Sequence, residues 1–288
     1  MKKTREMIEK HLSFVDVVCE VCDARIPVSS RNPIIKELAA GKIRILVLNK
    51  SDLADEGATK QWLSCLREPG KDKNFKAIAV NSMSGQGIKK LLEMLEHIAE
   101  EKADSGTKKS GIPLRLMIVG IPNSGKSSLI NRLAGRRAAQ VGDKPGITRG
   151  KQWLTLENGM QLLDTPGILW PKFEDPNAGL NLAFCGSIRD EIMDVSDLGL
   201  ELIRVLLQSY PEALVHRYSI EVSETKGAVS SEEALAVMED IAKRRGFILP
   251  GARIDYERTA RTVLDEFRGG KLGRLTLERP ACHCGQSE

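Results

Sequence analysis

The chain lacks the features that would place it in a membrane or among small secreted proteins. It has no run of about 18 apolar residues, the length that a membrane-spanning helix needs. Its first residues, Met1 to Glu6, carry several charges and lack the apolar segment of a secretory signal. Its six cysteines do not form the framework of a disulfide-stabilised secreted domain, so we expect a reducing compartment.

Length and charge set wider bounds. The 288 residues leave room for one main domain and a smaller second one, and the 41% hydrophobic content supports a substantial core. A net charge of +4 is compatible with an RNA partner but does not indicate one.

Apolar runs that alternate with amphipathic stretches predict an α/β fold in the first part of the chain. We expect strands at 14–23, 43–48, 75–80 and 114–119, and helices near 32–40, 56–67, 87–101 and 126–134. Two further strands, 152–156 and 161–163, are predicted as a hairpin around Asn158 and Gly159. The alternation implies a mostly parallel sheet with helices on both faces.

The pattern changes to helices from about residue 178. We therefore predict a first domain over residues 1–175 and a small all-helical domain over 176–288 with a frayed tail. The polar, glycine-containing segment 101–111 is predicted to be a linker inside the first domain.

A phosphate-binding loop is predicted at Gly120 to Ser127, because the pattern Gly-x4-Gly-Lys-Ser stands between a strand and a helix. Its glycines let backbone N–H groups face phosphate oxygens, and the helix start favours negative charge. We expect Lys126 to neutralise the β- and γ-phosphates and Ser127 to ligate Mg²⁺. The other expected nucleotide-binding residues here are Ser124, Gly125 and Ser128.

A base-reading motif, Asn49-Lys50-Ser51-Asp52, follows the strand at 43–48. An aspartate accepts hydrogen bonds from the ring N–H and the exocyclic amine of guanine, a donor pair that adenine lacks. Against adenine, a buried Asp52 would be left unpaired. We expect Lys50 to lie over the ring. Asn81 and Ser82 are weaker candidates for a backbone N–H that binds the guanine carbonyl, and a simple turn is the alternative.

The order of these motifs is inverted. An ordinary guanine-nucleotide switch has the phosphate loop first and the base reader late, whereas here Asn49 to Asp52 precedes Gly120 to Ser127. We interpret the first domain as a P-loop GTPase domain whose chain is circularly permuted.

The segment Asp164-Thr165-Pro166-Gly167 follows an apolar strand and is the candidate γ-phosphate sensor. We expect Asp164 to hold Mg²⁺ through water, Thr148 to supply its second hydroxyl ligand, and the Gly167 N–H to face the γ-phosphate. Lys126, Thr148 and Gly167 are thus the candidate catalytic residues. Many GTPases place a glutamine after this segment to orient water; this chain has Ile168, so we expect slow intrinsic hydrolysis.

Together these motifs resemble the circularly permuted ribosome biogenesis GTPase A family. Asp23 to Pro27, Ser29 to Pro33, the asparagine-containing phosphate loop and Ile168 carry the resemblance, which covers essentially the whole chain. It implies a cytoplasmic, monomeric GTPase that binds rRNA and ribosomal proteins of the large ribosomal subunit late in assembly, with the helical domain over 176–288 contacting the rRNA. It also implies that Asn123 binds a potassium ion, which adds positive charge in the transition state.

The resemblance leaves two functions open. The family usually begins with a segment similar to Trp-Phe-Pro-Gly-His-Met, whose histidine is proposed to assist hydrolysis, and this chain begins at what resembles the final Met. Either an upstream segment precedes Met1, or the protein hydrolyses GTP poorly. The alternative function is therefore an RNA-binding assembly scaffold that holds GTP with little turnover.

Three remaining features are ambiguous. Cys19 and Cys22 are three residues apart in a strand, so they are expected to face opposite sides and not to share a metal. The basic run Lys243 to Arg245 is predicted either to contact rRNA phosphates or to be a solvated helix end. Cys282 to Cys284 is expected to lie in a frayed tail.

Overall fold

The computed structural model describes residue 6 and residues 9–67, 72–106, 112–138, 153–164, 175–188, 193–222 and 227–280. The chain divides into two compact units, Met1–Lys172 with Arg279–Glu288, and Phe173–Glu278. Arg279 belongs to the first unit, where its guanidinium lies 3.5 Å from the Asp55 carboxylate. The sequence pattern instead assigns all of 176–288 to the second domain. That this domain contacts rRNA stays a prediction.

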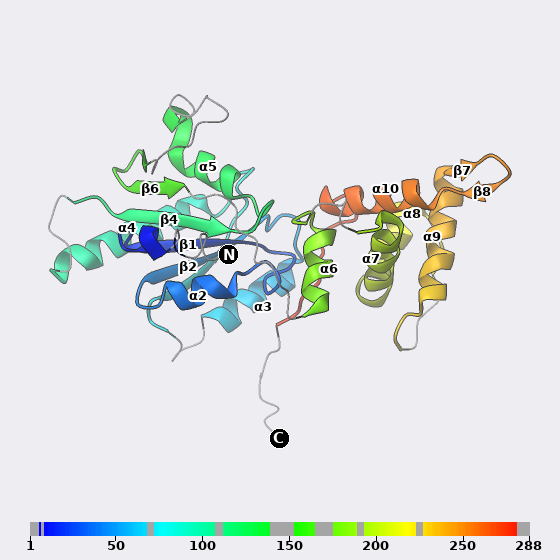
Figure 1. Cartoon of the computed structure of the whole chain (residues 1–288), viewed down its shortest axis with the longest axis horizontal. Helices are drawn as coiled ribbons and strands as arrows, with labels where there is room; N and C mark the ends of the chain where they lie inside the picture. The colour runs from blue at the N-terminus through cyan, green and yellow to red at the C-terminus, as the bar shows by residue number, and fades with distance from the viewer. Residues whose placement is uncertain are drawn as a thin grey trace, which may run out of the picture. The chain divides into compact units, whose positions relative to one another are not determined.

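The first unit is built on a six-stranded sheet in the order β3-β2-β1-β4-β6-β5 (Figure 1). Its strands are β1 (Val17–Asp23), β2 (Ile43–Asn49), β3 (Phe75–Ala79), β4 (Arg115–Gly120), β5 (Trp153–Thr155) and β6 (Gln161–Asp164). All neighbours pair in parallel except β5, which runs antiparallel to β6. The predicted mostly parallel sheet is confirmed, with the strand that leads into the phosphate loop in its interior.

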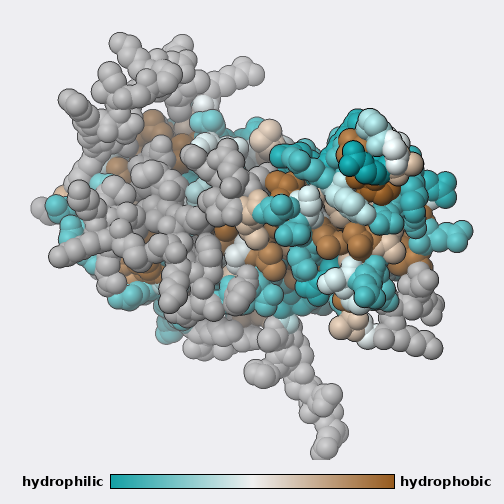
Figure 2. Space-filling model, turned by 45° about the vertical axis from the view of Figure 1, so that its right-hand side comes forward, coloured by the Kyte–Doolittle hydropathy of each residue, from teal (hydrophilic) through white to brown (hydrophobic). Residues whose placement is uncertain are grey.

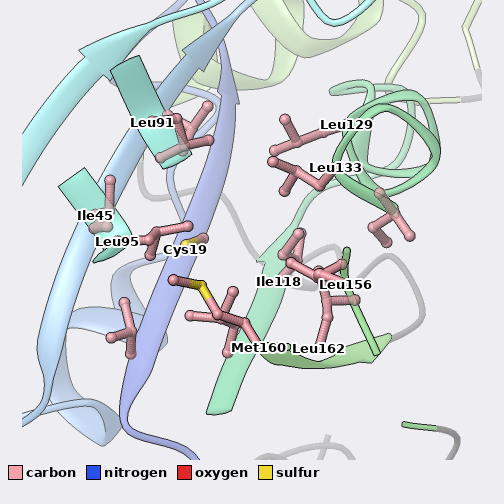
Figure 3. Packing of buried hydrophobic residues seen from close by; sticks show 14 of the residues in the cluster. Cys19, Ile45, Leu91, Leu95, Ile118, Leu129, Leu133, Leu156, Met160 and Leu162 are labelled. Atoms are coloured by element: carbon pink, nitrogen blue, oxygen red, sulfur yellow. The ribbon is translucent and has the colours of Figure 1, made fainter. Parts of the chain in front are cut away.

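Helices cover both faces of this sheet. The bounds are α2 (Pro33–Leu38), α3 (Glu56–Leu66), α4 (Ile88–Asp104) and α5 (Lys126–Ala138). Apolar residues of α4 and α5 form one core with the facing strand residues, including the fully buried Leu91 and Leu95 (Figure 3). Burying a leucine side chain contributes roughly 1.5–3 kcal/mol. Residues of α2 and α3 pack in two smaller clusters on the opposite face.

The two cysteines of β1 illustrate the period of two in a strand. Cys19 packs in the core under α4 and α5, whereas Cys22 packs in the cluster under α3. The thiols lie on opposite faces of the sheet, as their spacing predicts. Burial raises the pKa of Cys19 to about 12, so this thiol stays protonated at neutral pH.

The hairpin between β5 and β6 is also confirmed. Gly159 has a φ of 82°, which a residue with a side chain rarely adopts. The Leu156 N–H donates to the Met160 carbonyl at 2.8 Å and closes the turn. The hairpin pairs Trp153 with Leu163 and places Asp164 at the end of β6.

In its described residues the second unit is helical, with one short strand pair. Its elements are α6 (Pro176–Phe184), α7 (Val195–Ser209), α8 (Pro211–Tyr218), α9 (Ser231–Arg245), β7 (Ile248–Leu249), β8 (Arg253–Ile254) and α10 (Tyr256–Arg268). The helices α7, α9 and α10 pack against one another. At Gly199 a Cβ atom would lie only 2.4 Å from the Ala260 Cβ, so the missing side chain lets α7 and α10 approach closely. The pair β7–β8 differs from the all-helical prediction because two-residue strands leave no periodic pattern.

Apolar side chains reach the surface of the second unit among polar ones (Figure 2). Large exposed examples are Leu235, Ile248, Leu249 and Tyr256. Isolated exposed apolar residues are normal on folded proteins. No helix in the described part of the chain is long and apolar enough to cross a membrane.

Candidate nucleotide-binding site

The phosphate loop joins β4 to α5 and depends on three residues with positive φ. Gly120, Asn123 and Gly125 have φ values of 156°, 57° and 89°. A Cβ on Gly120 would lie 2.4 Å from the Val21 carbonyl oxygen, and one on Gly125 would lie 2.2 Å from Asn49 Nδ2. Glycine is therefore required at both positions by conformation and by space.

Two side chains brace the inside of this loop. Lys126 Nζ donates to the Ile121 carbonyl at 2.7 Å, and Ser124 Oγ donates to the same carbonyl at 3.0 Å. Both residues are buried, whereas Ser127 is exposed and Ser128 is half-buried in the first turn of α5. That turn contains no acidic residue, so the positive end of the helix dipole is not neutralised there. The loop is suited to an anion.

Asn49 connects the base-reading motif to the phosphate loop. Its Nδ2 donates to the Ser124 carbonyl at 2.9 Å, although the two residues are 75 positions apart. Its Oδ1 accepts hydrogen bonds from the Ser82 N–H at 3.1 Å and from Ser82 Oγ at 2.7 Å. Asn49 is 1% exposed. One buried amide thus holds three sequence motifs together at the carboxyl end of β2.

The loop after β3 is ordered by its own side chains. Asn81 Oδ1 accepts hydrogen bonds from the N–H groups of Met83 at 2.8 Å and of Ser84 at 3.0 Å. The Asn81 N–H donates to the Gln86 carbonyl at 2.9 Å. The Ser82 N–H has Asn49 as its acceptor, so a guanine carbonyl at this loop would share that donor with Asn49.

Lys50 has a buried anionic partner that the sequence reading did not identify. Its Nζ lies 3.0 Å from Asp23 Oδ2, and its backbone has a φ of 57°. Asp23 also accepts two hydrogen bonds from the Arg25 guanidinium, at 3.0 and 2.9 Å. Burial alone would raise the pKa of Asp23, but Arg25 and Lys50 hold it well below its ordinary value. The carboxylate therefore stays charged and fixes the Lys50 side chain.

Asp52, the base-reading carboxylate of the motif, lies at the protein surface. The residue is exposed, and its role in reading a base stays a prediction. It lies inside the turn in which the Leu53 N–H donates to the Lys50 carbonyl at 2.9 Å. Any burial of the Asp52 carboxylate has to come from a bound base.

The candidate γ-phosphate and metal residues are only partly within the described structure. Asp164 ends β6, where its Cα pairs with Ile118 of β4, two residues before Gly120. Its backbone thus lies beside the strand that enters the phosphate loop. Thr148, Gly167 and Ile168 lie outside the described residues.

Arg132 of α5 is a second residue that sequence reasoning missed. Its Nε donates to the Ser82 carbonyl at 3.1 Å, and its Nη2 donates to the Met83 carbonyl. The contact spans 50 positions, and a solvent-facing arginine on a helix carries no local signal of it. The side chain links the helix of the phosphate loop to the loop that follows β3.

The fold and the site define a P-loop GTPase with permuted strand order. A family profile described as "50S ribosome-binding GTPase" matches residues 115–233. The chain is 43% identical over 282 residues to ribosome biogenesis GTPase A of Bacillus cereus, covering 97% of this chain and 92% of that protein. The corresponding Thermotoga maritima protein is 33% identical, with 97% and 92% covered.

A solved structure agrees with these sequence relatives. The crystal structure of GNP-bound YlqF from T. maritima has a TM-score of 0.65 and 30% identity, covering 97% of this chain and 99% of that one. The chain belongs to the ribosome biogenesis GTPase A family, and it is a GTPase assembly factor.

The basic run at the end of α9 is largely engaged within the second unit. Lys243 Nζ lies 3.3 Å from an Asp240 carboxylate oxygen, and Arg245 Nη2 lies 3.3 Å from Glu266 Oε1. The Arg245 guanidinium also stacks on the Tyr218 ring, 5.2 Å from its centroid. These contacts favour the solvated helix end over a dedicated phosphate contact.

Proposed function

We propose that this chain is a cytoplasmic, monomeric GTPase that binds the large ribosomal subunit late in its maturation. GTP and GDP are its nucleotides, and rRNA and ribosomal proteins are its partners. The hydrogen bond from Asn49 to the Ser124 carbonyl carries the nucleotide part of the proposal, because it joins a guanine reader to a phosphate loop. The names of the relatives support the ribosomal part.

Two loops would read adjacent groups on one edge of the guanine base. Asp52 would accept hydrogen bonds from the ring N–H and the exocyclic amine, and the N–H of Ser82 would face the 6-oxo group. Asn81 would shape this loop, and Asn49 would hold it against the phosphate loop. The alkyl part of Lys50 would cover the ring while its ammonium stays on Asp23.

The phosphates would lie against the loop and the start of α5. The backbone of Ser124 and Gly125 and the first-turn residue Ser128 would cradle them, and Lys126 would exchange its bond to the Ile121 carbonyl for the β- and γ-phosphates. Lys126 therefore has a catalytic part, because it would neutralise charge that develops on the transferred group.

The residues present fit a magnesium ion. Mg²⁺ takes oxygen ligands and keeps several waters, so one hydroxyl and one carboxylate beside the phosphates suffice. Ser127 is exposed in the first turn of α5, and Asp164 ends the strand next to β4. We assign these two residues and Thr148 to the ion, which neutralises phosphate charge when bound.

Hydrolysis would depend on groups other than a glutamine. With Ile168 after the Gly167 sensor, no amide at this position can orient the attacking water. Asn123 stands in the phosphate loop with a left-handed backbone and an exposed side chain, and we assign it to a potassium ion. We therefore expect slow basal turnover that increases with potassium.

Two measurements test the proposal. Competition binding should show strong preference for GTP and GDP over ATP, and equal affinities for GTP and ATP would contradict the assignment of the site. Single-turnover hydrolysis should rise when large ribosomal subunits are added and when potassium replaces sodium. Tight GTP binding without stimulated turnover would instead favour the RNA-binding scaffold, and equal rates in sodium would remove the role given to Asn123.

A further inference from the structure

The loop after β3 is held at every backbone polar group of three consecutive peptides. The first peptide, between Asn81 and Ser82, has its carbonyl bonded by the Gly85 N–H at 2.8 Å and its N–H bonded to Asn49. In the next two, the N–H groups of Met83 and Ser84 donate to Asn81 Oδ1. The carbonyls of these two peptides both accept from Arg132.

Arg132 therefore holds the carbonyl side of the peptides whose N–H side is held by Asn81. Ser82 is thus held at its N–H by Asn49 and at its carbonyl by Arg132, so loss of the Arg132 bonds frees one side of this residue and lets its N–H shift. A planar guanidinium with several donors can hold two carbonyls at once, which a single ammonium does less well. Because Arg132 is exposed, water can replace its bonds, so its loss should cost little global stability.

We infer that Arg132 is a positioning residue for recognition of the guanine 6-oxo group, an inference that rests on the proposed nucleotide site. It does not touch the base. It fixes the loop so that the Ser82 N–H, which donates to Asn49 Oδ1, can be shared with the 6-oxo oxygen, while Asp52 reads the neighbouring ring N–H and 2-amino group. The helix that begins with the phosphate loop thereby also sets the geometry of guanine recognition.

Three nucleotides separate this role from a general loss of structure. GTP has the 6-oxo group, inosine triphosphate keeps it but lacks the 2-amino group, and 2-aminopurine riboside triphosphate lacks it. Dissociation constants would be measured for each by competition with a fluorescent GDP. For Arg132→Met we expect GTP and inosine triphosphate to weaken by roughly fivefold to tenfold, the effect of one lost hydrogen bond. The 2-aminopurine nucleotide should change by less than about twofold.

Arg67→Met is the matched control. Arg67 is also exposed, and its Nε and Nη2 both donate to a backbone carbonyl, that of Ala77 in β3, at 3.2 and 2.8 Å. It should leave all three affinities unchanged. Arg132→Lys, which keeps the charge without the planar fork, should give losses between those of the unmodified chain and Arg132→Met, and it serves if the methionine variant does not fold.

The outcomes are distinguishable. Equal losses for all three nucleotides would make Arg132 a general structural residue, and no loss for any of them would make it irrelevant; either result overturns the inference. If the unmodified chain did not prefer GTP to ATP, the proposed nucleotide site itself would fail, independently of Arg132.

Discussion

Replacing Asp23 by asparagine measures the contribution of a buried carboxylate. The substitution keeps the shape of the side chain but removes the charge that faces Arg25 and Lys50. The side chains of Asp23 and Arg25 are both 1% exposed, so the guanidinium would stay buried without its carboxylate. Losing one partner of such a pair costs roughly 3–5 kcal/mol. That is a large part of the ~5–15 kcal/mol by which a typical domain is stable.

Urea unfolding followed by tryptophan fluorescence reports on the first unit, which contains Asp23. The three tryptophans Trp62, Trp153 and Trp170 all belong to this unit. Asp72→Asn is the matched control. The Asp72 carboxylate also lies 3.0 Å from an arginine, Arg44, but it is 48% exposed, so its replacement should change the unfolding free energy very little. Equal losses from the two aspartate variants would refute the argument from burial.

The pH dependence of the Asp23→Asn effect follows from the depressed pKa of Asp23. An aspartate whose pKa is lower in the folded state stabilises the protein above its unfolded pKa, here 3.8, and loses this contribution as pH falls toward the folded value. The difference in unfolding free energy between the unmodified chain and the variant should stay constant from neutral pH to about pH 4 and decrease below it. A decrease between pH 7 and pH 5 would contradict the assignment to Asp23.

Three further predictions concern other parts of the chain. Asp52→Asn should shift preference from guanosine to xanthosine nucleotides in competition binding, because the amide offers a donor; unchanged guanine preference would count against Asp52 as base reader. Gly199→Ala should destabilise the second unit by about 1–3 kcal/mol in thermal melting, since its Cβ would lie 2.4 Å from that of Ala260; an unchanged melting curve would contradict that packing. Cys19 should resist alkylation until the chain unfolds, whereas the less buried Cys65 should react earlier, as peptide mapping would show.

Much of the fold could be predicted because its determinants are local. The runs that became β1, β2, β3 and β4 are apolar and bounded by polar segments, so their positions were predicted to within a few residues. The phosphate loop and Asn49 were recognisable because their chemistry needs fixed residue types at fixed spacing.

Other parts of the site could not be predicted because they depend on contacts between distant segments. The link from Arg132 to the Ser82 carbonyl and the ion pair between Lys50 and Asp23 leave no pattern in the sequence around either partner. The exposure of Asp52 depends on how the loop after β2 folds, which residue type alone does not determine.

The position of β4 in the sheet has a consequence for synthesis of the chain. The ribosome makes β1, β2 and β3 before β4, so the base-reading half of the sheet emerges with the flank of β1 uncovered. An uncovered strand edge invites pairing with another chain. β1 contains two carboxylates, Glu20 and Asp23, in an otherwise apolar strand, and in a parallel pairing of two such strands like charges would face each other. We expect these residues to protect the nascent protein from aggregation until its phosphate-binding half has left the ribosome.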